Sequence, residues 1–418
     1  MPSPESVKIR RLKILNSSAA QSWDSTANSN SKTAISPYKS FHENFENFPD
    51  PSRPAWIEVN FAALAHNLSE IRNRVAPAKV MAVVKANAYG HGLVPVARFY
   101  QQSAVDMLGV ALLEEALLLR ENGIACPILV FGGLLESQVP HFLLHHIDIT
   151  VSSLSKLEQV ERWALHLGCK ARIHIKLDTG MGRIGTRASS AQPMIEAALL
   201  SKNCQLIGIF SHFACADDPH DKMTALQLER FEEGIGYFEK LNAPIPMRHL
   251  ANSGAILHHP KSFFDMVRPG ILLYGIQPDS KSQVELELKR SLTLKAKTVF
   301  QKGMLKGQTV SYGATWKASK NTWISTLPIG YGDGFMRALS NKAEVLYEGK
   351  RFQVVGKICM DQMMIESPEI CIPNDAEMTV IGGSGEEMIT VEHLAEQAQT
   401  IPYEILTNLN SRLPRYYL

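Results

Sequence analysis

The chain has 418 residues, which exceeds one ordinary domain and suits a barrel of ~250 residues together with a second domain. Its hydrophobic content of 45% and charged content of 20% are typical of a globular protein that can bury a large core. A net charge of +2 argues against a function that depends mainly on electrostatic attraction to nucleic acid or to an anionic membrane. No apolar run approaches the ~20 residues that span a bilayer, so we expect neither a membrane nor a nucleic-acid partner.

Six cysteines are spread through the chain, too few and too far apart for a disulfide scaffold. They are Cys126, Cys169, Cys204, Cys215, Cys359 and Cys371. None forms a CxxC pair, and most lie in apolar surroundings that are typical of small buried side chains. This pattern favours a reducing compartment, and we expect the protein to be cytoplasmic.

Residues 1–53 differ in composition from the rest of the chain. They are rich in Ser, Asn and Lys, show almost no hydrophobic periodicity, and end in a proline-punctuated stretch from Pro49 to Pro54. The start is basic, but no apolar segment of the ~7–15 residues found in a signal peptide follows it. We therefore predict a polar, poorly ordered extension. The alternatives are an organellar targeting segment, or an initiation site upstream of the natural one.

Residues 54–283 alternate short apolar runs with amphipathic segments. Asn60 can cap a helix in which Leu64, Leu68, Ile71 and Val75 recur at helical spacing. Eight apolar runs follow at regular intervals, namely Val80–Val84, Met107–Ala111, Ile128–Phe131, Ile147–Val151, Ile173–Leu177, Leu206–Phe210, Met247–Leu250 and Ile271–Tyr274. This pattern predicts an α/β fold, a (β/α)8 TIM-type barrel. A doubly wound open sheet is the alternative, but the Gly-rich turn that would follow its first strand is missing.

In residues 284–418 the apolar and polar residues follow a different pattern. Leu286–Lys289 and Ser291–Lys297 alternate apolar and polar residues, which is typical of strands. Further β-rich runs, separated by turns that contain glycine, are Thr322–Pro328, Ala343–Leu346, Phe352–Ile358 and Met378–Ile381. One helix over Val391–Glu396 is expected near the end. We predict a separate, mostly-β C-terminal domain.

A lysine at the end of a buried strand is the first chemical signal. Lys85 directly follows the run Val80–Val84, and burying its ammonium is costly unless the charge is paired. It is expected on the face where the active sites of barrels form, together with Lys176, His212 and Ser253, which also end predicted strands. Desolvation there would lower the pKa of Lys85 and prepare it as a nucleophile for a Schiff base. On this residue alone, a lysine that extends over the barrel rim is an equal alternative.

The segment VVKANAYGHG around Lys85 resembles the cofactor-lysine motif of the alanine racemase family. The resemblance covers nearly all of residues 54–418 and continues, in order, through KLDTGMGRIG (176–185), FSHFA (210–214), ANS (251–253), VRPGI (267–271), VSYGAT (310–315) and CMDQ (359–362). Several independent motifs in register make chance agreement negligible. The resemblance implies an amino-acid racemase that uses pyridoxal 5'-phosphate to interconvert L-alanine and D-alanine.

By this resemblance, Lys85 holds the cofactor and is one of two catalytic bases, and Tyr312 is the other. Taking the α-proton from one face and returning a proton to the other requires two groups on opposite sides of the cofactor. In the family this tyrosine comes from the partner subunit, which implies a homodimer with shared active sites. Without the motif, a tyrosine in a strand-like run is more often a packing residue.

The resemblance also assigns the cofactor contacts. Arg268 is implied to face the pyridine nitrogen, which it would keep unprotonated because arginine itself stays protonated; this favours return of the proton to the α-carbon over transamination. His212 is implied to support this arginine, with a core histidine as the alternative. The implied phosphate contacts are Tyr89, Ser253, Gly270, Ile271 and Tyr403. Ser253 begins an apparent helix, whose free N–H groups favour an anion.

The implied contacts of the substrate carboxylate are Arg183 and Met360, the latter from the partner subunit. An arginine suits planar recognition of a carboxylate. Lys176 corresponds to a lysine that is carbamylated in many family members. The modification would turn a cation into an anion beside Arg183, and the sequence leaves open whether it occurs here.

Other classes compete with this interpretation. A pyridoxal-phosphate decarboxylase would share the barrel, the lysine and the β domain, but it would lack the KLDTGMGRIG and VSYGAT segments. A broad-spectrum periplasmic racemase should carry a signal sequence, and a single-barrel cofactor carrier would lack the second domain. Adjacent histidines such as His145 and His146 point apart and make poor ligand sets, so no metal site is expected. The breadth of substrates, and a role in peptidoglycan synthesis rather than catabolism of D-alanine, stay open.

Overall fold

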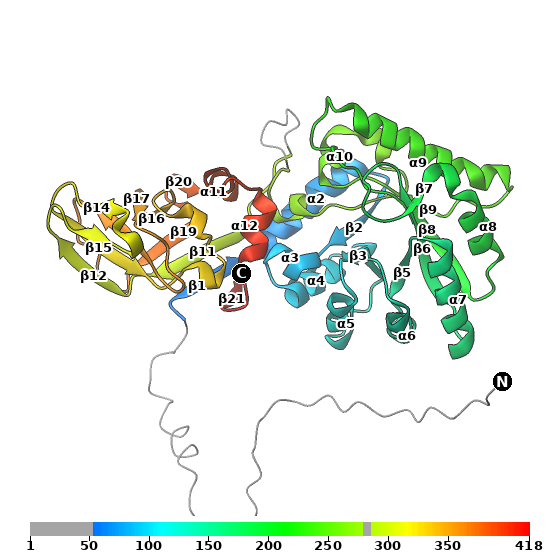
Figure 1. Cartoon of the computed structure of the whole chain (residues 1–418), viewed down its shortest axis with the longest axis horizontal. Coiled ribbons are helices and arrows are strands. Elements are labelled where there is room, and N and C mark those ends of the chain that lie inside the picture. The colour runs from blue at the N-terminus through cyan, green and yellow to red at the C-terminus, as the bar shows by residue number, and fades with distance from the viewer. Residues whose placement is uncertain (1–52, 279–285) are drawn as a thin grey trace, which may run out of the picture. The chain divides into compact units, whose positions relative to one another are not determined.

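The computed structural model describes residues 53–278 and 286–418. These residues form a barrel domain and a mostly-β domain (Figure 1), so the predicted fold class is confirmed. Apart from Arg53 itself, the extension expected over residues 1–53 lies outside the described residues. The domain boundary expected between residues 283 and 284 also falls at an undescribed stretch.

Eight parallel strands form the wall of the barrel, hydrogen-bonded in the order β10-β2-β3-β4-β5-β6-β8-β9. They are β2 (Lys79–Val83), β3 (Met107–Val110), β4 (Ile128–Val130), β5 (Asp148–Val151), β6 (Ala171–Asp178), β8 (Cys204–Phe210), β9 (Met247–His249) and β10 (Met266–Val267), and the short β7 (Thr186–Arg187) pairs with β6. Two backbone hydrogen bonds join β9 to β10. They run from Asp265 N to Arg248 O (3.1 Å) and from Arg268 N to Ala251 O (2.9 Å).

Helices connect the strands and cover the outside of the barrel (Figure 1). They are α2 (Phe61–Val75), α4 (Leu93–Gln102), α5 (Leu113–Glu121), α6 (Val139–Leu144), α7 (Leu154–Leu167), α8 (Gln192–Leu200), α9 (Lys222–Lys240) and α10 (Ser253–His258). The segment α3 (Lys85–Tyr89) is a left-handed turn after β2 and not a regular helix. The expected cap of α2 is present, because the Asn60 side chain accepts a hydrogen bond from the backbone N–H of Ala63. The four apolar residues expected on the inner face of this helix are all buried.

The alternation of side chains along β6 separates the outer core from the barrel interior. Ile173 and Ile175 are fully buried in the main hydrophobic core. The intervening His174 and Lys176 therefore face the barrel axis, since successive side chains of a strand point to opposite faces. The same strand thus builds the core with one set of residues and supplies the active-site end of the barrel with the other.

The prediction of the eighth barrel strand at Ile271–Tyr274 is wrong. Ile271–Tyr274 forms the 3-10 helix η5, and the eighth strand is the preceding β10. All four side chains of η5 are buried. A short run that is buried on every side has no periodicity that distinguishes a helix from a strand.

The mostly-β domain is built on a ten-stranded sheet in the order β12-β15-β18-β17-β16-β19-β11-β1-β21, with β20 paired to β19. Its strands are β1 (Ala55–Val59), β11 (Leu292–Lys297), β12 (Phe300–Met304), β15 (Thr322–Leu327), β16 (Glu344–Tyr347), β17 (Lys350–Val355), β18 (Met363–Ser367), β19 (Glu377–Ser384), β20 (Glu387–Ile389) and β21 (Arg415–Tyr417). Outside the sheet lie the hairpin of β13 (Thr309–Val310) and β14 (Trp316–Lys317), the 3-10 helix η6 (Tyr312–Ala314), and the helices α11 (Val391–Ala398) and α12 (Pro402–Asn408).

The strand expected over Leu286–Lys289 is also wrong. This stretch belongs to no strand, and its backbone is held by a side chain instead of a neighbouring strand. Asn67 accepts a hydrogen bond from Lys289 N (2.7 Å) and donates one to Lys289 O (2.8 Å). Alternation of apolar and polar residues therefore arises here from packing of Leu286 and Leu288 on the core without a β ladder.

The mostly-β domain is built from segments on both sides of the barrel in the sequence. β1 precedes the barrel in sequence but pairs antiparallel with β11, with Ala55 opposite Ala296, and parallel with β21, with Ile57 opposite Arg415. The chain therefore begins in the sheet of the mostly-β domain, runs through the barrel and returns to the same sheet.

A buried histidine lies where the turn after β2 meets the mostly-β domain. His91 Nδ1 lies 2.9 Å from Tyr89 O, and its Nε2 lies 2.9 Å from Ser291 Oγ. Close by, Arg415 Nε donates to Gly90 O (2.8 Å). The pKa of His91 is lowered from 6.5 to about 4, mainly by burial and to a smaller extent by the charge of Arg415, against the hydrogen bonds to backbone carbonyls, which raise it. His91 is thus neutral in the folded protein at neutral pH.

We predict that His91 makes the fold sensitive to acid. Because its folded-state pKa of about 4 lies below 6.5, the unfolded chain binds the proton more tightly. The stability that His91 contributes is complete above pH 6.5 and is lost as the pH falls through this window, about 3 kcal/mol in total. His91→Gln should flatten the fall of unfolding free energy, measured by denaturant titration at several pH values. The exposed His166→Gln should retain the wild-type slope, and an equal slope in both variants would contradict the prediction.

Candidate active site

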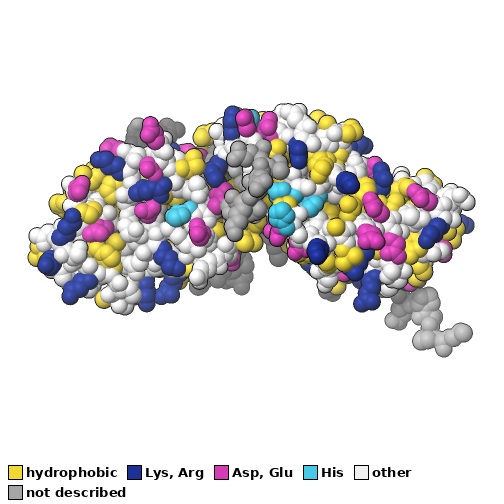
Figure 2. All heavy atoms as spheres, turned by 90° about the horizontal axis from the view of Figure 1, so that it is seen from above, with side chains coloured by type: hydrophobic (Ala, Val, Ile, Leu, Met, Phe, Trp, Pro, Cys, Tyr) yellow, Lys and Arg dark blue, Asp and Glu magenta, His cyan; other side chains and the backbone are white. Residues whose placement is uncertain are grey.

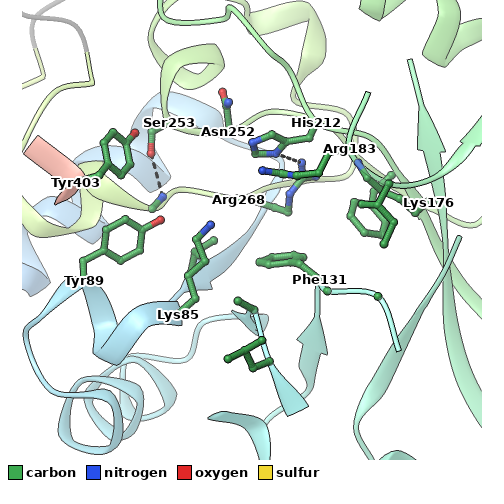
Figure 3. Close-up of a pocket in the computed structure, with 18 residues that line it drawn as sticks. Lys85, Tyr89, Phe131, Lys176, Arg183, His212, Asn252, Ser253, Arg268 and Tyr403 are labelled. Carbon is green, nitrogen blue, oxygen red and sulfur yellow. Dashed lines mark hydrogen bonds between the residues drawn. The ribbon is translucent and has the colours of Figure 1, made fainter. Parts of the chain in front are cut away.

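A cavity of about 510 Å³ opens at the carboxyl ends of the barrel strands. Its lining residues are Val83, Lys85, Tyr89, Ala111, Leu112, Phe131, Gly132, Gly133, Lys176, Arg183, Ile184, Phe210, His212, Asn252, Ser253, Arg268, Gly270 and Tyr403. In Figure 3 the Lys85 side chain points into this cavity, with Tyr89 on one side and Arg268 on the other. The structure therefore brings Lys85, Lys176, His212 and Ser253 together, although they lie far apart in the sequence.

The charge of the cavity is one-sided. Four cationic side chains line it, namely Lys85, Lys176, Arg183 and Arg268, and none of its lining residues is an Asp or a Glu. Buried or half-buried cations without carboxylate partners are unfavourable unless a ligand supplies the opposite charge. The cavity is therefore suited to an anionic ligand.

Lys85 begins a turn of unusual backbone conformation. The four residues that follow it, Ala86 to Tyr89, all have positive φ angles, between 52° and 55°. This left-handed conformation costs about 1–2 kcal/mol per residue outside glycine. The turn is tied down by Glu115, whose Oε1 accepts a hydrogen bond from Ala86 N (2.6 Å), and by Asn87 Oδ1, which accepts one from Leu93 N (2.8 Å).

The surroundings of Lys85 favour its neutral amine. Burial is the main cause of its lowered pKa, and the positive charges of Arg183 and Arg268 lower it further, while Glu115 opposes the change. A neutral amine is the form that attacks a carbonyl and that accepts a proton. The strand end that carries this lysine thus supplies a nucleophile and a base in one side chain.

Arg268 lies directly after β10 at the floor of the cavity. Its guanidinium donates to three backbone carbonyls, those of His249 (2.5 Å), Ser211 (2.6 Å) and Leu250 (2.9 Å). His212 Nδ1 lies 3.5 Å from its NH2, as the dashed line in Figure 3 marks. Burial lowers the pKa of Arg268 to about 9. Burial and the neighbouring cations, Arg268 first among them, hold the pKa of His212 well below its ordinary value.

The opposite end of the cavity has the form of an anion cradle. The hydroxyl of Ser253 accepts a hydrogen bond from Gly270 N (2.9 Å), and the rings of Tyr89 and Tyr403 lie 6.0 Å apart. A Cβ on Gly270 would lie 2.3 Å from Tyr89 Oη, so only glycine fits beside this hydroxyl. Burial raises the pKa of both tyrosines, which keeps their hydroxyls as hydrogen-bond donors. Ile271 follows Gly270 at the start of η5 and does not line the cavity.

Lys176 is, with Arg268, one of the two buried cationic residues that line the cavity. It is 4% exposed, and its Nζ has no hydrogen-bond partner in the part of the chain that the structure describes. The Nζ lies 4.6 Å from the centre of the Phe210 ring. Burial, followed by the charges of Arg268 and Arg183, holds its pKa well below the ordinary value.

Tyr312 and Met360 lie apart from the cavity of their own chain. Tyr312 begins η6 in the mostly-β domain, and neither residue lines the cavity. The exposed fractions of these side chains are 71% for Tyr312 and 54% for Met360, which is high for large side chains. The cavity of one chain is thus lined by only part of the set of site residues that the sequence predicted.

Several lining residues were missed by the sequence analysis. Phe131 at the end of β4 and Phe210 at the end of β8 form part of the cavity wall, and Asn252 lies at its edge. Asn252 also caps α10, because its Oδ1 accepts a hydrogen bond from Ala255 N (3.0 Å). Their position at strand ends was the available signal, but an aromatic residue there is also typical of ordinary core packing.

The fold and the site define a two-domain barrel enzyme with a cationic, acid-free cavity around a lysine of lowered pKa. The chain belongs to the alanine racemase family. The family's N-terminal domain matches residues 59–278 and its C-terminal domain matches residues 291–417.

Relatives of known name and structure agree with this assignment. An alanine racemase of Carboxydothermus hydrogenoformans is 40% identical over 376 residues, which cover 88% of this chain and 100% of that protein. The crystal structure of alanine racemase from Streptomyces lavendulae is 35% identical, with a TM-score of 0.85 and coverage of 88% of this chain and 98% of that one. The structure of alanine racemase from Bacillus anthracis with bound L-Ala-P is 33% identical, with a TM-score of 0.83 and coverage of 88% and 96%.

We predict that glycine is tolerated in the turn after Lys85 where it is harmful in an ordinary helix. Ala86→Gly relieves a left-handed φ of 53° and should leave the unfolding free energy unchanged or raise it by up to about 1 kcal/mol. The control is Ala225→Gly, an equally exposed position within α9, which should lose about 1 kcal/mol. Denaturant titration at equal protein and cofactor concentrations measures both. Equal losses would show that the turn is unstrained.

Proposed function

We propose that Lys85 and Tyr312 are the two bases with which the chain interconverts L-alanine and D-alanine. The interconversion is the activity of the family to which the chain belongs. The observation that carries the assignment of residues is the cavity itself, which gathers four cations and no acid around a lysine whose pKa is lowered. Such a cavity suits the carboxylate of an amino acid and the phosphate of a cofactor at the same time.

Pyridoxal 5'-phosphate is the cofactor of the family, and the residues present fit it. The hydroxyls of Tyr89, Ser253 and Tyr403 line the cavity beside Gly270, where any larger residue would collide with Tyr89, and such hydroxyl and backbone groups suit a phosphate. We assign the phosphate to Tyr89, Ser253, Gly270, Ile271 and Tyr403, and the covalent attachment to Lys85. When bound, the cofactor supplies the electron sink that makes the α-proton of alanine removable.

Arg268 tunes this electron sink from the side of the pyridine nitrogen. An arginine has donors and no acceptor, so it leaves the facing nitrogen unprotonated. The weaker sink favours return of the proton to the α-carbon, which is the outcome that racemisation needs. His212, whose Nδ1 lies 3.5 Å from Arg268, supports the guanidinium in this position.

The substrate carboxylate is assigned to Arg183, with Met360 as the second contact. Lys176 lies deeper, and Arg183 is one of the charges that lower its pKa. A neutral buried amine without a hydrogen-bond partner is the form that reacts with carbon dioxide. We therefore propose that Lys176 is carbamylated, which places an anion that attracts Arg183 where a protonated amine would repel it.

The second base requires a second subunit. Tyr312 is 71% exposed and lies outside the cavity of its own chain, as does Met360. Racemisation needs a proton donor on the face of the α-carbon opposite Lys85. We propose a homodimer in which Tyr312 and Met360 each complete the partner's cavity.

We infer the cellular compartment and the absence of nucleic-acid and membrane partners from the surface charges and the cysteines. Acidic and basic side chains are interspersed over the face in Figure 2, which supports the absence of a nucleic-acid partner. All six cysteines are free, which supports a cytoplasmic location. We propose a cytoplasmic role with no membrane partner, in which D-alanine either supplies peptidoglycan or is catabolised. No helix among residues 53–278 and 286–418 is long and apolar enough to cross a membrane.

Tyr312→Phe tests the division of labour between the bases. The change keeps the ring and removes the proton carrier, so the visible absorbance of bound cofactor should persist while kcat falls by about 10²–10⁴-fold in both directions. Tyr416→Phe makes the same chemical change at another exposed tyrosine of the mostly-β domain and should retain full activity. Full activity in Tyr312→Phe would mean that a different residue acts on the second face.

Mixing two inactive variants tests the shared site. Lys85→Ala and Tyr312→Phe chains that exchange subunits should form mixed dimers with one intact site and one doubly damaged site. Half of the dimers are mixed at random exchange, so about a quarter of the wild-type racemase activity should return. If both residues acted within one chain, every site would carry a lesion. Absence of recovery after exchange is verified by mass would therefore rule out the shared site without affecting the assignment of the reaction.

A further inference from the structure

The interior of the barrel is divided into an apolar and a polar part. The apolar part is a cluster of buried side chains, Met81, Met107, Leu129, Phe210 and Met266. The polar part is a line of four side chains that we call the interior relay, Asp148, His174, His249 and Arg268. No member of the relay is more than 4% exposed. Because polar groups in such a place are costly unless they are bonded, the contacts within this line need an explanation.

The interior relay is a continuous series of hydrogen bonds along the barrel axis. His174 Nε2 lies 3.3 Å from Asp148 Oδ2, His174 Nδ1 lies 3.0 Å from His249 Nε2, and His249 Nδ1 lies 3.1 Å from Arg268 NH1. Asp148 is the first residue of β5, at the amino end of the barrel. Arg268 follows β10 and lines the cavity at the carboxyl end. The relay therefore connects the cavity to the opposite end of the barrel.

The two ends of the relay determine the position of every proton in it. A guanidinium only donates hydrogen bonds and an ionised carboxylate only accepts them, whereas a neutral imidazole does one of each. All three contacts are satisfied only if both His174 and His249 carry their proton on Nε2. His249 Nδ1 then offers its lone pair to Arg268.

The ionisation states agree with this arrangement. Burial alone would raise the pKa of Asp148, but hydrogen bonds from His174 and Arg172 outweigh it and the pKa is lowered. Arg172 Nε and NH2 lie 2.7 and 3.1 Å from the two oxygens of this carboxylate. Burial and the charge of Arg268 hold the pKa of His249 well below its ordinary value, so this ring is neutral.

Arg268 has no acid in direct contact. Its other hydrogen bonds go to backbone carbonyls and to His212, and it takes part in none of the ion pairs found within the described ranges. Asp148 is thus the carboxylate to which Arg268 is linked, through two imidazole rings. Such a connected network in a low-dielectric interior is polarised along its length.

The packing around the relay holds its rings in place. A Cβ on Gly208 would lie 2.4 Å from His174 Nδ1, so the glycine on the neighbouring β8 makes room for this ring and its hydrogen bond. The Phe210 ring stacks on His249 with centroids 4.7 Å apart and planes inclined by 7°. Both histidines are therefore confined to orientations in which the relay is continuous.

We propose that Asp148 is a positioning residue for Arg268. Through His174 and His249 it holds both imidazoles as neutral Nε2–H tautomers and thereby orients and polarises the guanidinium at the cavity floor. The consequence for catalysis rests on the proposed role of Arg268 at the cofactor. The tautomers themselves follow from the barrel interior alone, so they can be tested independently of that role.

Nuclear magnetic resonance of the full-length, cofactor-loaded protein with ring-¹⁵N histidine tests the tautomers. We expect His174 and His249, assigned by comparison with His174→Gln and His249→Gln, to show a protonated Nε2 and an unprotonated Nδ1. His249 should keep this state from about pH 5 to 8, where ordinary histidines titrate. A protonated Nδ1 on either ring in the wild-type protein would overturn the proposal, whatever the racemase activity.

Asp148→Asn tests the anchor of the relay. An amide replaces one acceptor oxygen by a nitrogen that donates, so it cannot accept all three hydrogen bonds that Arg172 and His174 make to the two carboxylate oxygens. We expect the Nε2–H signals of both histidines to weaken. The kcat for alanine should fall by about tenfold, the lower end of the losses caused by removing outer partners of functional histidines. The KM should change little, since Arg183 is untouched.

Asp265→Asn is the matched control. It removes a similar arginine–aspartate pair at the amino end of the barrel, where Arg248 Nε and NH2 each lie 2.9 Å from the carboxylate oxygens, but this pair is outside the relay. Histidine tautomers and kcat should stay at wild-type values. Should Asp148→Asn fail to fold, Gly208→Ala replaces it, because its methyl group must displace the His174 ring. Unchanged tautomers, or a loss of kcat equal to that of Asp265→Asn, would overturn the proposal.

Discussion

The cost of holding positive charge away from water is the constraint on which this structure depends. Lys85, Lys176 and Arg268 converge at one end of the barrel, and burial is the main cause of the lowered pKa of each. No acidic residue lines the cavity to compensate them. An anionic cofactor and an amino-acid carboxylate would supply the missing charge, so the cavity and these ligands are complementary in charge. The same desolvation lowers the pKa of both lysines and thereby favours the neutral amine, the form that chemistry at a carbonyl requires.

The rest of the fold serves to keep these cations in place. β6 carries Lys176 on the face opposite the hydrophobic core, and the left-handed turn after β2 aims Lys85 into the cavity. That turn is held from outside the barrel, because Arg415 of β21 donates to Gly90 O and the buried His91 bonds to Ser291 before β11. The mostly-β domain therefore stabilises the lysine turn as well as carrying Tyr312.

Prediction from the sequence was correct where a local pattern had one physical cause. Asn60 and the apolar residues after it predicted α2, since capping and helical spacing act within a few residues. It failed at Ile271–Tyr274, where burial on every side leaves no alternation of apolar and polar residues to read. It also failed at Leu286–Lys289, where the Asn67 side chain bonds the backbone in place of a neighbouring strand. Phe131 and Asn252 were missed because an aromatic residue or a cap at a strand end has an ordinary structural role as well.

The sequence by itself determined the family, the barrel followed by a β domain, and the residues whose chemistry suits a pyridoxal-phosphate racemase, because these depend on residue type and spacing along the chain. Only the tertiary structure decided that β1 belongs to the sheet of the mostly-β domain and that Tyr312 lies outside the cavity of its own chain. It alone also aligned Asp148, His174 and His249 beneath Arg268. These residues come from four separate strand regions, and their relation arises from closure of the barrel, which brings together positions that no local pattern connects.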